Sequence, residues 1–421
     1  MNETLSPASY RNGKLVIDGV DALSIAEAFG TPVHCYSRAA LEQRWRAYHE
    51  AFGSRRHQIC YAVKANDNLS ILKTLHDLGA SFDIVSGGEL SRVLAIGANP
   101  EQVVFSGVGK SHKEIEAALK ARVGCINIES DTELRRAESM ASALDVDCDV
   151  AVRVNPDVDA GTHPYISTGL KENKFGVPIS EALELYRTIH KGSRLRPVGI
   201  ACHIGSQLTS IAPVVDAVAD VVQLADRLAA DGIEVTHIDV GGGLGISYHE
   251  ETPPSIEELV TAICEVVPEN YRIDMEPGRS LIGKSGVLLT TVEYIKRTVA
   301  KNFAIVDAAM TELLRPSLYQ AWHDVMTYEA SPDAPSLPVD IVGPVCESGD
   351  WLAQGRSLAI AEGDLLAILD TGAYGAVMSS NYNARPRAAE VLVDDRKVHL
   401  VRARQTAEDM MANEVEHLIE Y

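Results

Sequence analysis

Several reactive side chains stand at the ends of short apolar runs in this 421-residue sequence. Lys64 closes the run YAVK, His203 follows VGIAC, and Glu276 follows YRIDM. An apolar setting favours a lysine as its neutral amine, the form that attacks an aldehyde. The alternative for Lys64 is a side chain that extends to the end of a strand and keeps its charge in water.

A glycine-rich stretch, Gly241 to Gly245, follows the run THIDV. Glycines leave backbone N–H groups accessible to a phosphate, and a nearby helix N-terminus would add to the attraction. The alternative is a purely structural turn.

Glu276 and His203 could both contact a planar aromatic cofactor. A carboxylate such as Glu276 beside the nitrogen of a pyridine ring would keep that nitrogen protonated, and the alternative for Glu276 is a salt bridge to Arg279. His203 can stack on a planar ring or serve as a hydrogen-bonded core histidine.

Eight β-branched runs alternate with amphipathic stretches and would position these residues. Such alternation predicts parallel strands with right-handed helical crossovers, and eight strands close a (β/α)8 TIM barrel. An open doubly wound sheet is the alternative. In a barrel, the C-terminal strand ends form one face, where we expect the reactive side chains to gather. The runs span residues 58–66, 81–86, 103–107, 124–130, 149–155, 198–206, 236–243 and 271–279.

The pattern changes after Arg279, where strand-like runs are separated by turn residues and helical periodicity is sparse. This pattern predicts a mostly antiparallel β domain. The fold class is therefore α/β, and we predict three parts. They are a segment over 1–30 that packs on the β domain, a barrel over 31–280, and a C-terminal β domain over 281–421.

Composition narrows the class of protein further. The net charge of -21 opposes binding to nucleic acid. The seven cysteines form no CxxC pair, which argues against a disulfide framework or a metal site. A reducing, cytoplasmic location fits this cysteine usage. The N-terminus lacks a secretory pattern, and no apolar run is long enough to span a membrane.

The residues above lie within a series of ordered motifs that covers almost the whole chain. On these motifs the chain resembles the fold-type III pyridoxal-phosphate (PLP) decarboxylases, most closely those that act on diaminopimelate. The resemblance implies a PLP cofactor and decarboxylation of meso-2,6-diaminopimelate to L-lysine, the last step of lysine biosynthesis. The motifs are YAVKANDN, FDIVSGGEL, HPYISTGLKENKFG, HIGSQL, DVGGGLG, EPGR, LLRPSLY, GPVCESGD and DTGAYG.

The resemblance also implies roles for individual residues in holding the cofactor. Lys64 corresponds to the lysine that bonds to the PLP aldehyde, His203 to the residue stacked on the ring, and Glu276 to the partner of the ring nitrogen. The implied phosphate contacts are Ser206, Gly243, Gly278, Arg279 and Tyr374. The implied supporting residues are Asp83 and Arg153.

Other implied roles concern the substrate. Arg279, Arg315 and Tyr319 resemble the group that holds the distal carboxylate, which the planar fork of arginine suits. Tyr374 is expected to contact the substrate as well. Cys346 and Glu347 resemble catalytic residues that a second subunit contributes, so the resemblance implies a homodimer with shared active sites.

Three alternatives to this function stay open. An ornithine- or arginine-type decarboxylase would carry an aspartate where this chain has Glu347. An amino-acid racemase on the same barrel would place an arginine against the ring nitrogen, where this chain has Glu276. A catalytically silent regulatory homologue would have lost some cofactor-binding residues. The chain departs from its relatives at Lys284, where they usually carry a small apolar residue, and the sequence offers no account of that change.

Overall fold

The computed structural model describes residues 6–158, 168–169, 173–330 and 335–419. The chain forms two compact units. One unit contains residues 43–247 and 251–281, and the other contains residues 1–42, 248–250 and 282–421. Part of the predicted motif HPYISTGLKENKFG lies outside the described residues.

The first unit is a closed barrel of eight parallel strands, as predicted. Neighbouring strands pair around the ring, and β8 pairs with β9 to complete it. The barrel strands are β5 (His57–Ala62), β6 (Ser81–Ile84), β7 (Val103–Phe105), β8 (Cys125–Ile128), β9 (Cys148–Asn155), β11 (Leu195–Cys202), β12 (His237–Asp239) and β13 (Arg272–Met275). A two-residue strand, β10 (Val177–Pro178), pairs with β9 outside the ring. The open doubly wound alternative is excluded because the sheet closes on itself.

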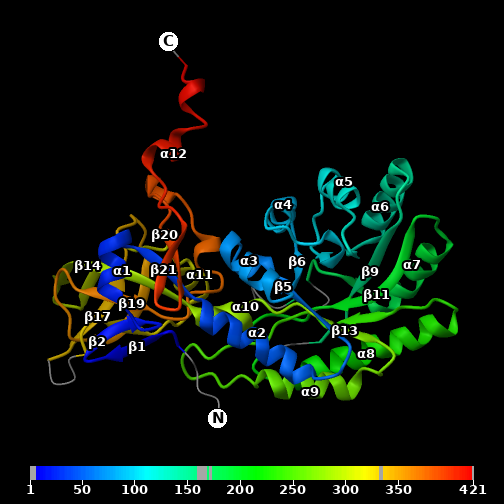
Figure 1. Cartoon of the computed structure of the whole chain (residues 1–421), viewed down its shortest axis with the longest axis horizontal. Coiled ribbons are helices and arrows are strands. Elements are labelled where there is room, and N and C mark those ends of the chain that lie inside the picture. Colours follow the sequence, from blue (N-terminus) through cyan, green and yellow to red (C-terminus); the bar gives the residue numbers. More distant parts are fainter. Residues whose placement is uncertain (1–5, 159–167, 170–172, 331–334, 420–421) are drawn as a thin grey trace. The chain divides into compact units, whose positions relative to one another are not determined.

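Helices flank the barrel strands (Figure 1). They are α2 (Arg38–Phe52), α3 (Leu69–Asp77), α4 (Gly87–Ala95), α5 (His112–Ala121), α6 (Asp131–Leu144), α7 (Ile179–Lys191), α8 (Ala212–Ala230) and α9 (Ile256–Val266). Local sequence explains where several of them begin. Ser111 and Ser255 form capping boxes with the glutamates three residues later, which satisfies N–H groups that the first turn leaves without partners. Gly79 and Gly232 follow α3 and α8 with φ of 93° and 77°, the left-handed backbone that ends many helices.

The second unit is built on a mixed, mainly antiparallel sheet. Its longest strand is β14 (Gly286–Arg297), which pairs with three neighbours. The other strands are β4 (Val33–Ser37), β15 (Asn302–Val306), β16 (Val325–Thr327), β17 (Leu337–Val342), β18 (Trp351–Leu358), β19 (Leu365–Ile368), β20 (Ala389–Asp394) and β21 (Lys397–Arg402). Among the strand pairs that the structure describes in this sheet, β15–β17 and β4–β20 are parallel and the others are antiparallel. The C-terminal β domain is therefore confirmed.

Residues from the start of the chain share the core of this sheet. β1 (Ala8–Arg11), β2 (Lys14–Ile17) and β3 (Val20–Asp21) form a small antiparallel sheet, followed by α1 (Ala22–Phe29). Leu15 and Ile25 are buried in one cluster with Leu289 and Val391. This burial fixes the N-terminal segment to β14 and β20.

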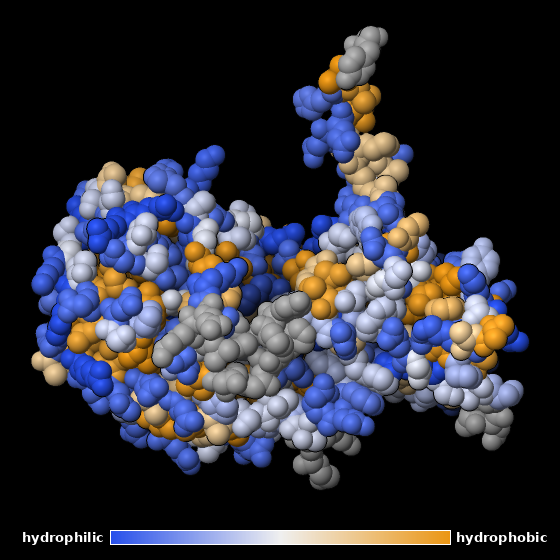
Figure 2. All heavy atoms as spheres, turned by 180° about the vertical axis from the view of Figure 1, so that it is seen from behind, coloured by the Kyte–Doolittle hydropathy of each residue, from blue (hydrophilic) through white to orange (hydrophobic). Residues whose placement is uncertain are grey.

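Hydrophilic side chains cover much of the surface, with apolar patches between them (Figure 2). Apolar side chains are also exposed on the C-terminal segment, where Val415, Leu418 and Ile419 follow the short helix α12 (Ala407–Met411). Among the described residues, no helix has the length and apolar character needed to cross a membrane.

Candidate active site

Lys64 lies just beyond the C-terminal end of strand β5. The strand stops at Ala62, and Lys64 occupies a 3-10 turn over Val63–Ala65, which Asn66 closes by donating its N–H to the Val63 carbonyl. The sequence had suggested that the strand itself ends on the lysine. Lys64 Nζ donates to Asp83 Oδ2 at 2.5 Å, and the Asp83 side chain is completely buried on β6. The structure thus joins two of the predicted site residues.

His203 follows strand β11, and the glycine stretch after β12 lies against its ring. The Gly242 N–H donates to His203 Nδ1 at 3.2 Å, so a neutral ring carries its proton on Nε2. Burial lowers the pKa of His203 well below its ordinary value, and the positive charges of Arg153 and Lys64 lower it further. The imidazole is therefore uncharged at neutral pH, as a ring that stacks on another aromatic system should be.

Four of the five predicted phosphate contacts follow three neighbouring barrel strands, namely Ser206 after β11, Gly243 after β12, and Gly278 and Arg279 after β13. Gly243 has φ of 100°, and a Cβ there would stand 2.4 Å from the Gly205 carbonyl oxygen. At Gly278 a Cβ would crowd Ala65 at 3.0 Å. Arg279 Nη2 donates to Ser206 Oγ at 3.1 Å, and only 6% of Arg279 is exposed. The tightly packed glycine backbone, the Ser206 hydroxyl and the buried Arg279 guanidinium together form a cradle suited to an anion.

Glu276 follows strand β13 within a group of carboxylates. Burial raises its pKa well above the usual range, and the nearby Asp239 and Asp83 raise it further while Lys64 opposes them. Burial also raises the pKa of Asp239 to about 7. Ser106 Oγ donates to Glu276 Oε1 at 3.3 Å. Glu276 is consequently a more basic carboxylate than an exposed one, and a strong acceptor for a protonated ring nitrogen.

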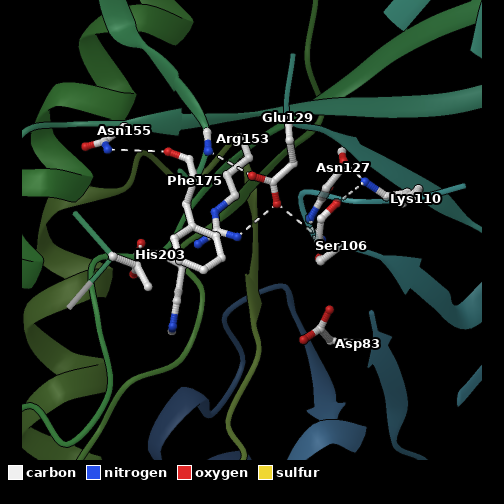
Figure 3. Close-up of polar contacts among 12 residues, drawn as sticks. Asp83, Ser106, Lys110, Asn127, Glu129, Arg153, Asn155, Phe175 and His203 are labelled. Carbon is white, nitrogen blue, oxygen red and sulfur yellow. Dashed lines mark hydrogen bonds and ion pairs between the residues drawn. The ribbon is translucent and has the colours of Figure 1, made fainter. Parts of the chain in front are cut away.

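A polar network follows strands β7 to β9 and includes residues that the sequence analysis missed (Figure 3). Arg153 donates to Glu129 at 2.9 Å, and the second oxygen of Glu129 accepts from the Gly176 N–H at 2.8 Å. Asn127 Nδ2 donates to Ser106 Oγ at 3.0 Å, which extends the network to the hydroxyl that contacts Glu276. Ser106 and Glu129 both stand at the end of a predicted strand, and that position was the available signal.

Arg315 and Tyr319 are the first and last residues of the short helix α11 (Arg315–Tyr319) in the second unit. Arg315 is 5% exposed, and its guanidinium carbon lies 4.2 Å from the centre of the Tyr248 ring. Tyr319 is half-buried. The structure therefore places a buried arginine in the LLRPSLY motif.

Tyr374 lies in a tight loop after β19 and has a left-handed backbone with φ of 57°. The loop is fixed to the start of β14, because the Thr371 N–H donates to Gly286 and the Gly372 N–H to Gly283. Lys284 forms an ion pair with the buried Asp370 at 2.7 Å. Lys284 thus supports the loop that carries Tyr374.

Cys346 and Glu347 lie on an exposed loop of the second unit, after β17. Cys346 is the one exposed thiol among the seven unpaired cysteines. Glu347 accepts a hydrogen bond of 2.5 Å from the Tyr382 hydroxyl. Both side chains are accessible on the surface of this chain.

The barrel residues fit PLP, which the family resemblance implied. A lysine stands beside Asp83, whose Oδ1 is buried and has no hydrogen-bond partner among the described residues. A neutral histidine, a basic carboxylate and a glycine-lined anion cradle match the ring, the ring nitrogen and the phosphate of that cofactor. Among the described residues, no three or more His, Cys, Asp or Glu side chains are arranged so that they could hold a metal ion.

Comparisons with known proteins agree with this geometry. A family model described as "Pyridoxal-dependent decarboxylase, pyridoxal binding domain" matches residues 38–283. The diaminopimelate decarboxylase of Pseudomonas aeruginosa is 53% identical over 96% of this chain and 98% of its own length. That of Vibrio cholerae is 49% identical over 96% of this chain and 97% of its own.

A solved structure gives the same result. Diaminopimelate decarboxylase from Helicobacter pylori, complexed with L-lysine, has a TM-score of 0.92 and 43% identity, covering 94% of this chain and all of that one. The shared fold and the sequence similarity both extend over nearly the full length of this chain. The chain therefore belongs to the diaminopimelate decarboxylases, a family of PLP-dependent amino-acid decarboxylases.

Proposed function

We propose that this chain converts meso-diaminopimelate to L-lysine and CO2 as the last step of lysine biosynthesis. The observation that carries the proposal is the 53% identity to a diaminopimelate decarboxylase over 96% of the chain. The Helicobacter pylori relative is complexed with L-lysine, the compound that remains when meso-diaminopimelate loses one carboxyl group. We assign the reaction to the cytoplasm, because seven unpaired thiols suit a reducing compartment.

The barrel residues would bind and orient the cofactor. When bound, PLP supplies an electron sink for the electron pair that the departing CO2 leaves behind. Lys64 would hold the cofactor through its aldehyde group. His203 would cover one face of the ring. Ser206, Gly243 and Arg279 would hold the phosphate.

Glu276 would hold a proton between its carboxylate and the ring nitrogen. Its raised pKa favours this role, because a more basic carboxylate is a stronger acceptor for an N–H donor. Ser106 donates to the same carboxyl group and would limit its rotation. A carboxylate here also argues against the racemase alternative, which would use an arginine.

The second unit would recognise the end of the substrate that does not react. Arg315 and Tyr319 would bind the distal carboxylate, and Glu347 the distal amine. Ornithine and arginine offer no carboxylate at that end, so a buried arginine favours diaminopimelate over both. A silent regulatory homologue is disfavoured, because the cofactor-binding residues are all present.

We further propose that two copies of the chain share their active sites. Cys346 and Glu347 are exposed on this chain, which leaves them accessible to a second copy. When the bond to the carboxylate breaks, a proton replaces CO2 on Cα, and either Cys346 of the second copy or Lys64 would deliver it. Mixed dimers of the inactive variants Lys64→Ala and Cys346→Ala should recover part of the activity. Verified subunit exchange without recovery would contradict shared sites.

The direct experiment measures product from purified protein with PLP in three parallel reactions. Lysine from meso-diaminopimelate, with no product from ornithine or arginine, is the expected result. Putrescine from ornithine or agmatine from arginine would keep the fold and cofactor but overturn the assignment of Arg315. No product in any reaction, together with no absorbance from bound PLP, would favour the regulatory homologue.

A further inference from the structure

A completely buried histidine contacts Arg315 in the second unit. His323 is 0% exposed and lies between α11 and β16. Its Nε2 stands 2.8 Å from Arg315 Nη1, and its Nδ1 stands 2.7 Å from the carbonyl oxygen of Leu369. The imidazole therefore bridges the guanidinium and the backbone just before the loop that carries Tyr374.

The two contacts determine where the ring proton lies. A carbonyl oxygen only accepts hydrogen bonds, so Nδ1 must carry the proton and donate it to Leu369. A guanidinium only donates, so Nε2 must present its lone pair to Arg315. Both bonds can exist together only when His323 is neutral and protonated on Nδ1. The ring is thus a directional link that fixes one nitrogen of Arg315.

Further contacts hold this pair in place. The Tyr248 ring lies beneath the guanidinium at 4.2 Å and meets the His323 ring edge-on, with centroids 5.2 Å apart. Arg356 Nη2 donates to the His323 carbonyl oxygen at 2.8 Å. An arginine side chain has considerable rotational freedom when exposed, and contacts of this kind remove it before a ligand arrives.

We propose that His323 is a positioning residue that fixes Arg315 for the distal carboxylate of the substrate. The inference rests on the proposed function, because it requires Arg315 to bind that carboxylate. His323 acts through Arg315 and takes no part at the reacting carbon. Substitution of His323 should weaken the binding of ligands that carry the distal carboxylate and leave the binding of ligands without it unchanged.

Two amide substitutions separate this role from simple packing. In His323→Gln, the side-chain oxygen can reach the position of Nε2 and still accept from Arg315. In His323→Asn, the amide can replace Nδ1 at the Leu369 carbonyl but is too short to reach Arg315. The two variants therefore each keep one of the two hydrogen bonds.

The ligands are lysine, which retains the distal carboxylate, and cadaverine, which is lysine without it. We would measure inhibition constants for both, KM and kcat for meso-diaminopimelate, and the absorbance of bound PLP. For His323→Asn we expect the KM and the lysine inhibition constant to rise about 10- to 100-fold, as for a lost hydrogen bond to a charged group. The cadaverine constant and the PLP absorbance should stay unchanged, and His323→Gln should retain most of the wild-type preference for lysine.

Equal weakening of lysine and cadaverine in both variants would overturn the inference in favour of packing alone. Unchanged lysine binding in His323→Asn would overturn it as well. If His323→Asn fails to fold, His323→Gln alone tests the inference. If this variant loses the preference of the wild type for lysine over cadaverine, the link between His323 and Arg315 is refuted. Wild-type turnover of meso-diaminopimelate is measured first and tests the proposed function separately.

Discussion

The glycine cradle allows a prediction whose size follows from the geometry. In Gly243→Ala, the added Cβ would lie 2.4 Å from the Gly205 carbonyl oxygen and 2.7 Å from Leu208 Cδ1. The φ of 100° costs an alanine about 1–3 kcal/mol. Moving the loop to relieve the clash would also break the 2.8 Å bond from the Leu208 N–H to the Gly243 carbonyl, worth about 1 kcal/mol.

These costs should appear when PLP binds. Without PLP, the loop can relax away from Gly205, whereas binding the phosphate requires the original backbone. A total of about 2–4 kcal/mol corresponds to a Kd for PLP about 30- to 1000-fold higher. Titration of the PLP-free protein, followed by absorbance, measures this Kd directly.

Gly79→Ala is the matched control. Gly79 has φ of 93°, but a Cβ there would meet nothing within 4 Å. Its backbone strain should lower the melting temperature and leave the Kd for PLP unchanged. If Gly243→Ala binds PLP as tightly as the wild type, or if both variants weaken binding equally, the cradle does not hold the phosphate.

Two further predictions concern carboxyl groups. Glu276→Gln should lower kcat about 100- to 1000-fold with little change in KM, because it weakens a charged contact to the ring nitrogen; steady-state kinetics check this, and a change in KM alone would contradict it. Burial raises the pKa of Glu312 to about 7, so its contribution to stability is present below its unfolded pKa and is lost as the pH rises through about 7. The free energy of unfolding should therefore fall more between pH 5 and 8 in the wild type than in Glu312→Gln, as urea denaturation measures, and parallel pH profiles would refute this assignment.

Local sequence patterns predicted the barrel because each strand and helix carries its own signal. β-branched runs predicted all eight barrel strands within a few residues. The hydrophobic pattern carried less information on which strands pair with one another. Val33–Ser37 is a buried strand near the start of the chain, and its partners β14 and β20 both come from the C-terminal half.

In the candidate site, too, some residues could be recognised from the sequence and others only from the fold. Lysine, histidine and glycine types at strand ends were sufficient to nominate Lys64, His203 and Gly243. Ser106 and His323 were not nominated, because a lone serine or histidine in a sequence carries no sign of what its side chain contacts. Their contacts depend on residues 170 and 8 positions away, which only the folded chain brings together.

The central claim is that Lys64 carries PLP for the decarboxylation. Borohydride reduction of the PLP-loaded protein, followed by peptide mass mapping, tests it most directly. We predict one reduced pyridoxyl phosphate per chain on the peptide that contains Lys64, with lysine formation lost in proportion to the labelling. Labelling at another residue, or full activity after complete labelling of Lys64, would contradict the account.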